Sequence, residues 1–208
     1  MVVPPILIEN MSIPDVQLIF GGIAAFSALL FLILARENPP TPPCPAGKET
    51  RALMLDGLKH ALRVPSFWLY LFMSFIGLGI FNGMNTWVEN IIRPRGFTPT
   101  DAGTVGAVML AGGLVGAVLI PPFSDKKHKR KPFLLLGFAL CIPGLLGMAF
   151  ATELWLLLVS SFFFGFFLTS ANPIGMQYAA EITQPTPEGT SNGLIQLFGQ
   201  ASVVFVYI

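Results

Sequence analysis

The chain has 208 residues, of which 53% are hydrophobic and 11% charged, and its formal net charge is +1. Soluble domains carry about 25% charged residues, so this composition excludes an ordinary soluble domain and indicates a protein that lies in lipid. The small net charge argues against a nucleic-acid partner.

Long apolar segments divide the chain. Because about 20 apolar residues cross a bilayer, six spans are predicted, at 13–35, 66–91, 100–121, 132–152, 154–182 and 190–208. Residues 1–12 are expected to form an extracytoplasmic loop. The last span stops at the final residue with no polar flank, so we expect it to be truncated. The fold class is therefore an all-α membrane protein, integral and multi-pass, expected in the cell membrane with lipid around it.

Basic residues predict the orientation of the spans. Five follow the first span and five follow the third, within 126–131, whereas Arg93 and Arg95 alone lie between the second and third. Short loops rich in Lys and Arg stay on the cytoplasmic side. Both basic segments are therefore expected there, and one alternating topology accommodates all six spans.

The segment 36–65 is predicted to be a cytoplasmic linker. Five prolines between Glu37 and Lys48 favour extended polyproline conformations over a continuing helix. Further on, Leu55, Leu58 and Leu62 recur at helical spacing beside basic residues, which predicts a short helix lying on the membrane surface. The remaining residues, 66–208, are expected to form a bundle of five helices.

The stretch GAVLIPPFSDKKHKRKP, residues 116–132, places Asp125 where the third span ends, followed by five basic residues. An acidic side chain there can cap a helix or pair with Arg130 as a latch that a conformational change would break. The alternative is that the basic residues only anchor the topology and bind anionic headgroups.

Polar residues inside spans are costly and usually face the bundle interior, so they are the main candidates for function. Asn82, Asn85 and Glu89 follow steps of three and four residues and share one helix face. Asn82 and Asn85 are expected to line a cavity. Glu89 lies toward the outer end, where it either couples transport to protons, reaches water or pairs with Arg93.

Two later spans carry polar faces as well. In the fifth, Ser170, Asn172, Gln177 and Glu181 lie around Pro173, which is expected to loosen the helix, either at a binding site or as a structural kink. Glu181 is expected to join a cytoplasmic gate. In the sixth, Gln196 and Gln200 lie four residues apart on one face.

Small residues form a face on the third span. Gly112 and Gly116 make a GxxxG pattern, which lets two helix backbones approach closely. Tight helix packing is the predicted role.

The stretch with Asp125, Arg130 and Lys131 resembles the signature loop of the major facilitator superfamily, although the expected glycines are absent. The segments 81–118 and 165–200 resemble, more closely, transporters related to the feline leukaemia virus subgroup C receptor. The resemblance implies a major facilitator fold, of which this chain would be the six-helix C-terminal bundle, partnered by an N-terminal bundle of the same protein. Asp125, Arg130 and Lys131 match the charged positions of that signature loop and are expected, with Glu181, to form the gate.

The resembled family has a substrate-contacting glutamine where this chain has Gln200, which implies solute binding there, although the neighbouring family residues differ. Choline, ethanolamine and haem are among the substrates proposed for that family. Its tyrosine in the seventh helix falls near 81–83, where this chain has none. Since a quaternary ammonium group needs aromatic faces, choline remains open.

The function predicted is secondary transport, facilitative or ion-coupled, of a small solute by alternating access. The alternative is a non-transporting membrane receptor or scaffold that binds partners through the linker and basic loop. No phosphate loop, nucleophile elbow or metal-ligand spacing occurs in the sequence, so no enzyme activity, metal or cofactor is expected.

Overall fold

A computed structural model describes residues 12–34, 54–127 and 129–206. The chain divides into two units, Met1–Thr50 and Arg51–Ile208. Most of the predicted N-terminal loop and the proline-rich part of the linker lie outside the described residues. The helix α2 (Ile13–Leu34) represents the first unit. It begins with a cap in which the Ser12 hydroxyl bonds the Asp15 carboxylate at 2.5 Å.

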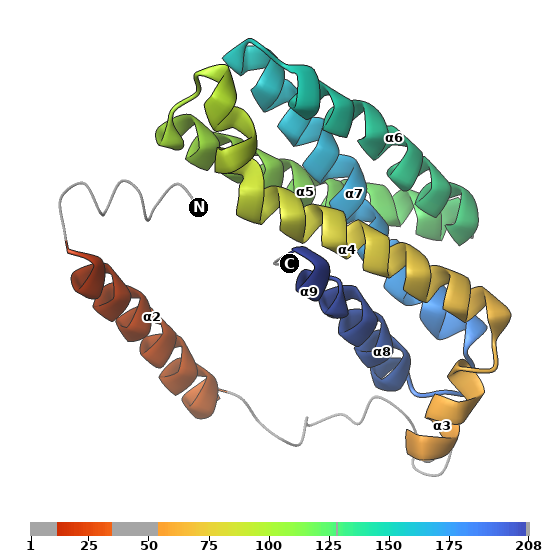
Figure 1. The fold of residues 1–208 in the computed structure, drawn as a ribbon. Helices are drawn as coiled ribbons and strands as arrows, with labels where there is room; N and C mark the ends of the chain where they lie inside the picture. Colours follow the sequence, from red (N-terminus) through yellow and green to blue (C-terminus); the bar gives the residue numbers. More distant parts are fainter. Residues whose placement is uncertain (1–11, 35–53, 128, 207–208) are drawn as a thin grey trace. The chain divides into compact units, whose positions relative to one another are not determined.

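The second unit is a bundle of helices (Figure 1). Their bounds are α3 (Met54–Ala61), α4 (Pro65–Ile92), η1 (Arg93–Arg95), α5 (Pro99–Lys127), α6 (Arg130–Phe150), α7 (Leu154–Ile182), α8 (Glu188–Ala201) and α9 (Val203–Val206). α7 packs against α5 on one side and α6 on the other, and α4 packs mainly against α8. Among the described residues, five helical segments are long and apolar enough to cross a membrane: Pro14–Leu34, Pro65–Arg95, Pro99–Lys127, Arg130–Phe150 and Leu154–Ile182. These segments agree with the first five predicted spans.

Local sequence signals set the turn between α4 and α5. After η1, Gly96 adopts a positive φ of 87°, which glycine tolerates without steric cost. Two residues later a capping box starts α5: the Thr98 amide donates to the Asp101 carboxylate at 2.8 Å, and the Asp101 amide donates to the Thr98 hydroxyl at 3.2 Å. The turn is thereby closed by its own residues.

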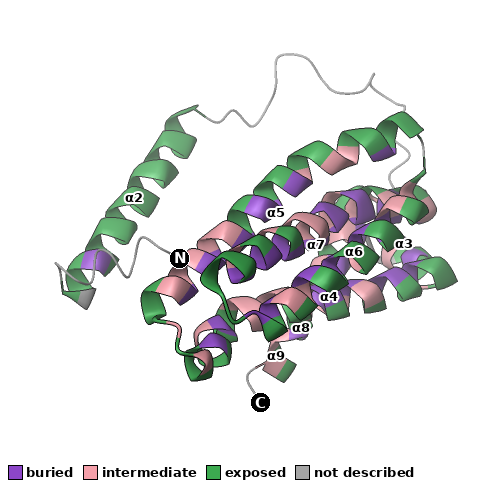
Figure 2. Ribbon diagram, turned by 90° about the horizontal axis from the view of Figure 1, so that it is seen from above, coloured by how far each residue is buried: buried purple, intermediate pink, exposed green. Residues whose placement is uncertain are grey.

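The predicted small-residue face packs α5 against α7. A Cβ at Gly112 would lie 3.1 Å from the Phe162 Cα, and one at Gly116 would lie 3.0 Å from the Phe166 Cα. From the other side, a Cβ at Gly165 would overlap the Met109 carbonyl. Figure 2 shows buried residues where α5, α6 and α7 meet. Because lipid gives helices little hydrophobic reason to associate, such close backbone contact supplies much of the attraction.

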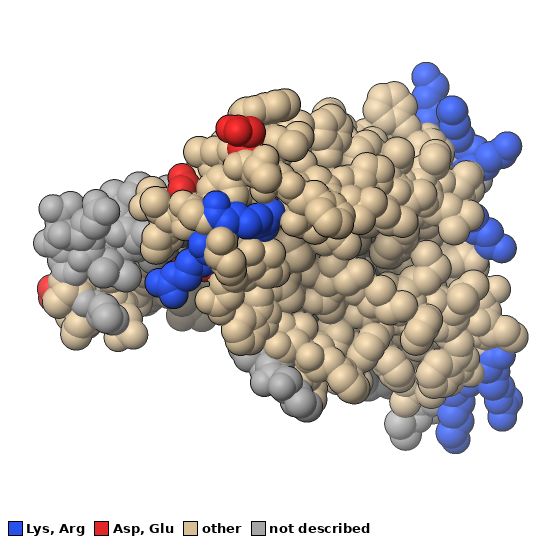
Figure 3. Space-filling view, turned by 45° about the horizontal axis from the view of Figure 1, so that its top comes forward, with Lys and Arg blue, Asp and Glu red and all other residues tan. Residues whose placement is uncertain are grey.

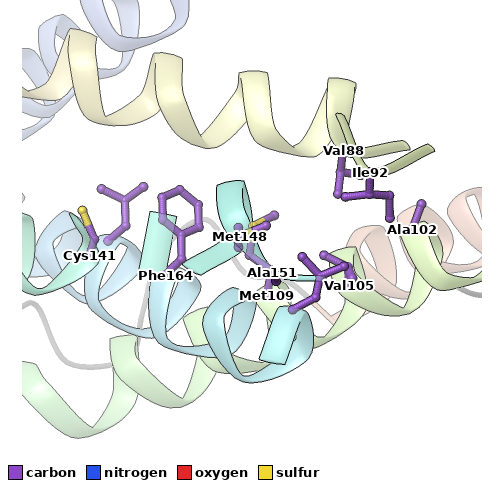
Figure 4. Packing of buried hydrophobic residues seen from close by; sticks show 11 residues of the cluster. Val88, Ile92, Ala102, Val105, Met109, Cys141, Met148, Ala151 and Phe164 are labelled. Atoms are coloured by element: carbon purple, nitrogen blue, oxygen red, sulfur yellow. The ribbon is translucent and has the colours of Figure 1, made fainter. Parts of the chain in front are cut away.

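Two apolar clusters fill the bundle. One extends from the end where α4 meets α5, and Figure 4 shows Val88 and Ile92 of α4 near Ala102 of α5 at that end, with Met148 and Phe164 farther along the cluster. The other lies toward the opposite end, around Phe67, Leu134 and Ile195, the last from α8. Both ends of the described bundle are therefore packed.

Two boundaries differ from the sequence prediction. α5 continues through Pro121 and Pro122 to Lys127, so Asp125 lies on the last turn of a helix rather than in a loop. Buried Ser124 holds this turn by donating to the Lys129 carbonyl at 3.3 Å. The predicted span 190–208 consists of α8 and α9, separated at Ser202, whose hydroxyl bonds the Gly199 carbonyl at 2.5 Å.

Candidate functional site

Two of the predicted solute-binding residues meet across the bundle. The Asn82 side-chain amide on α4 donates to the Gln200 side-chain oxygen on α8 at 3.5 Å. That distance is long for a hydrogen bond, so the contact is weak and easily exchanged for one with another polar molecule. Asn82 is partly buried and Gln200 is exposed. The pair therefore presents polar groups at an accessible surface between α4 and α8.

The other two predicted solute-binding residues are placed differently. Asn85 donates to the Phe81 carbonyl of its own helix at 2.9 Å, and its side-chain oxygen is buried without a partner among the described residues. Leaving such an acceptor unpaired costs about 1–3 kcal/mol, so the site favours a donor that would fill it. Gln196 is partly buried one turn before Gln200.

A cavity of about 80 Å³ lies between α4, α6 and α7. Its lining residues are Tyr70, Ser74, Gly77, Leu78, Phe81, Phe138, Leu168, Thr169, Ala171 and Asn172. The sequence analysis marked Asn172 as part of a polar face but overlooked Tyr70 and Thr169. No pattern along the sequence indicated them, since only the packing of three helices brings them together.

An ionic network around Arg130 joins α5, α6 and α7. It lies near the N-terminal end of α4. The Arg130 side chain is 11% exposed and pairs with Asp125 on α5 and with Glu181 on α7, which are 61% and 43% exposed. Its Nη2 and Nε lie 3.0 and 3.1 Å from Glu181 Oε1. The guanidinium also donates to the Ser124 hydroxyl at 3.4 Å. Three of the four predicted gating residues are thus brought together.

Lys131, the fourth predicted gating residue, lies apart from this network. Its Nζ is 6.0 Å from the centre of the Tyr178 ring. Within the described residues it forms no ion pair. Figure 3 shows Lys and Arg side chains in two separate groups, with a broad uncharged surface between them.

Glu89 lies close to Arg93, which is one of the three alternatives that the sequence left open for it. Its carboxylate lies 3.9 Å from the Arg93 guanidinium, four residues along, and both side chains are exposed. Such exposed pairs contribute about 0–1 kcal/mol. This pairing does not test whether the Glu89 carboxylate couples transport to protons, so that stays a prediction.

Arg95 has a role that the sequence analysis missed. Its Nη1 donates to the carbonyls of Met148, Ala149 and Ala151 at 2.9, 3.2 and 2.9 Å. These carbonyls end α6 and have no partner within the helix, so a cation there satisfies them. The sequence alone showed only a basic residue in an outer turn.

The short helix α3 was expected, but its partners were not. Thr186 donates its hydroxyl to the Gly57 carbonyl at 2.9 Å, and the His60 ring lies 3.0 Å from the Gln184 carbonyl. A Cβ at Gly57 would lie 2.9 Å from the Pro187 ring. α3 is therefore bound to the turn between α7 and α8, although the prediction concerned its position on a membrane surface.

The apolar helices and their small-residue packing define an integral, multi-pass membrane protein of the all-α class. The chain belongs to the Major Facilitator Superfamily, whose sequence profile matches residues 1–207. This result confirms the resemblance and the fold class predicted from the sequence.

Relatives from several organisms are similar to this chain. An uncharacterized protein of Archaeoglobus fulgidus is 31% identical over 197 residues, covering 92% of this chain and 86% of that protein. The choline/ethanolamine transporter flvcr2b of Danio rerio is 28% identical over 219 residues, covering 95% and 45%. Solute carrier family 49 member A3 of Danio rerio is 31% identical over 191 residues, covering 88% and 40%. The chain thus spans less than half the length of these two fish relatives.

Proposed function

We propose that this chain contributes a bundle to a secondary transporter that moves a small solute across the membrane by alternating access. The observation that carries the proposal is the contact between Asn82 and Gln200, because it sets exchangeable polar groups at an accessible face of an otherwise apolar bundle. Superfamily membership supports the class of function. In this proposal a second, N-terminal bundle of the same protein faces the pair, and rocking of the two bundles exposes the solute to each side in turn.

The solute proposed is a small polar molecule with a hydrogen-bond donor. The unpaired oxygen of Asn85 favours a hydroxyl or ammonium hydrogen, and Gln196 and Gln200 offer both donors and acceptors. The names of the fish relatives make ethanolamine and choline the first solutes to test. Ethanolamine carries N–H donors that the quaternary nitrogen of choline lacks, so we propose that this chain favours ethanolamine.

The Arg130 network is the proposed gate on the side of the basic loop. It ties the end of α5, the start of α6 and the end of α7 through Asp125 and Glu181. Because these carboxylates are partly exposed, water can replace the contacts at modest cost. Breaking and remaking them is how the gate would open and close.

The transport proposal predicts that Gln200→Ala weakens uptake. The protein is reconstituted in liposomes from its complete reading frame, and uptake of labelled ethanolamine and choline is followed with time. Losing one solute contact costs about 1–1.5 kcal/mol, so kcat/KM should fall about ten-fold. Asn90→Ala, which alters an exposed amide two turns from Asn82 on the same helix, should leave uptake within about two-fold.

Three outcomes contradict parts of this proposal. Unchanged uptake and affinity in Gln200→Ala would remove the glutamine from the solute site. Equal losses in Gln200→Ala and Asn90→Ala would point to damage of the fold. If neither solute is carried and no flux of other small polar solutes is detected, the receptor or scaffold alternative is favoured instead.

Proton coupling through Glu89 remains a proposal with a separate test. If Glu89 carries the proton, an imposed pH gradient should drive uptake several-fold above the rate without a gradient, and Glu89→Gln should abolish that difference while leaving solute exchange intact. Uptake that ignores the gradient would eliminate the coupled version and leave a facilitative transporter. The exposed pair with Arg93 already gives the carboxylate a structural partner.

A further inference from the structure

Two neighbouring cavities between α4, α6 and α7 are described together as one groove. It consists of two cavities that share Tyr70, one of about 80 Å³ and one of about 180 Å³. The larger lies toward the end that carries the basic loop and is lined by Ser66, Leu69, Tyr70, Met73, Lys131, Leu134, Leu135 and Tyr178. α4 packs mainly on α8 and α6 mainly on α7, and the groove lies between the two pairs.

The walls of the groove are apolar and its mouth is basic. Leu69 on α4 and Leu135 on α6 are exposed, and both line the cavity together with buried Leu134. Lys131 lies at the same cavity in the first turn of α6, with its Nζ above the ring of Tyr178. The groove is thus amphipathic: one end is positively charged and the rest is lined mainly by apolar side chains.

The charge of Lys131 is available for a ligand. The neighbouring Arg130 is engaged by Asp125 and Glu181, whereas Lys131 contacts no carboxylate in the described part of the chain. Tyr178 and Ser66, each of which carries a hydroxyl group, line the same cavity. Together these groups supply one positive charge and two hydrogen-bond donors, which is the chemistry that holds a phosphate ester.

We propose that this groove binds an anionic phospholipid, with its phosphate on Lys131 and one acyl chain along Leu69, Met73 and Leu135 toward Tyr70. Basic pockets between membrane helices on the side of a basic loop are suited to anionic headgroups. The inference rests on membership of a membrane-protein family and is independent of what the protein transports.

A third cavity provides an internal comparison. It lies between α6 and α7 toward the other end, has a volume of about 390 Å³, and is lined by apolar residues with Ser160. No basic side chain lines it. If volume alone selected lipid, this cavity would be preferred without regard to headgroup charge; the proposal instead assigns the headgroup preference to the smaller groove beside Lys131.

The test compares two lysines with the same local geometry. Lys127 also lies with its Nζ 6.0 Å from an aromatic ring, that of Phe133, but it does not line the groove. The purified protein in detergent micelles is titrated with phosphatidylglycerol or phosphatidylcholine of identical acyl chains, and binding is read by native mass spectrometry and by the shift in melting temperature.

We expect phosphatidylglycerol to bind more tightly than phosphatidylcholine. Lys131→Gln should weaken phosphatidylglycerol binding about five-fold, as expected for losing one basic contact, while Lys127→Gln retains it. Equal losses in both variants would show a diffuse attraction to the whole basic loop and would overturn the proposal. So would unchanged binding in Lys131→Gln.

A second pair of variants tests the acyl chain. Leu135→Trp narrows the groove, whereas Leu136→Trp places the same bulk on an exposed neighbour that does not line it. The first should reduce the lipid-induced stabilisation and the second should not. If Leu135→Trp lowers the melting temperature without added lipid, and both lipids bind equally, the groove is covered by polypeptide and the proposal fails.

Discussion

Replacing Gly116 by alanine should destabilise the bundle strongly, because the added methyl group would meet the backbone of α7. A Cβ at this position would lie 2.8 Å from the carbonyl carbon of Phe166 and 3.0 Å from its Cα. These are backbone atoms of α7, which cannot rotate aside as a side chain does, so α5 and α7 must separate along their length. Overpacking of this kind costs about 1–3 kcal/mol, and we expect the upper part of that range.

The measurement is the midpoint of thermal or denaturant unfolding of the purified protein in detergent. Gly193→Ala serves as the matched control, because nothing lies within 4 Å of a Cβ there and the residue is inside α8. Alanine in a helix interior is favoured over glycine by about 1 kcal/mol, so the control should keep or raise the midpoint. A Gly116→Ala protein as stable as the control would contradict the close approach of α5 to α7.

Replacing Arg130 by glutamine should loosen two segments that are 51 residues apart in the chain. The guanidinium pairs with Asp125 on α5 and with Glu181 on α7, and glutamine cannot bridge both. The turn at 126–130 and the end of α7 should then open more often, because the same side chain restrains both. We expect amide hydrogen exchange in both segments to rise about ten-fold, equivalent to about 1.4 kcal/mol of local stability.

Two further variants isolate the role of the guanidinium. Lys126→Gln removes a neighbouring exposed charge that is absent from the network, and it should leave exchange in both segments unchanged. Arg130→Lys keeps the charge but loses the planar fork, so we expect an intermediate rise. If Arg130→Gln alters only the 126–130 turn and leaves the end of α7 unaffected, the network does not connect the helices as the gate requires.

The elements of this fold follow from local patterns that a sequence displays directly. Apolar runs of sufficient length located α2, α4, α5, α6 and α7, since the bilayer sets a minimum length for each. The pattern of Gly112 and Gly116 indicated a close helix contact, which is confirmed. It did not indicate the partner, because the partner α7 contributes backbone atoms, and these carry no sequence signal.

Tertiary contacts account for what the sequence analysis missed. Arg130 and Asp125 were paired in the prediction because they are close in the chain, and Glu181 was added because it lies at the cytoplasmic end of its span. Arg95, in contrast, binds carbonyls 53 to 56 residues away. Any residue type offers a carbonyl, so no spacing in the sequence could reveal the contact. The groove beside Lys131 is likewise formed by three helices and is invisible in any one of them.

The C-terminal end of α5 was also not predicted correctly from the sequence. The length of the apolar run predicted the end of the third span near 121. Instead α5 continues to Lys127, since Ser124 is buried and bonded on both sides. Local propensity was overridden there by contacts with α6.

Two arginines, Arg130 and Arg95, hold opposite ends of α6 and restrict how that helix can move. Arg130 starts the helix and is bound to α5 and α7, while Arg95, reaching from the turn after α4, grips its last carbonyls. A helix of 21 residues is about 30 Å long. The two arginines therefore hold α6 at points separated by about the thickness of the apolar layer. Sliding of α6 along its own axis would break the contacts of either Arg130 or Arg95. While both contacts hold, α6 is restrained along its own axis; if the proposed gate opens at Arg130, only the contact of Arg95 with the far end of the helix remains.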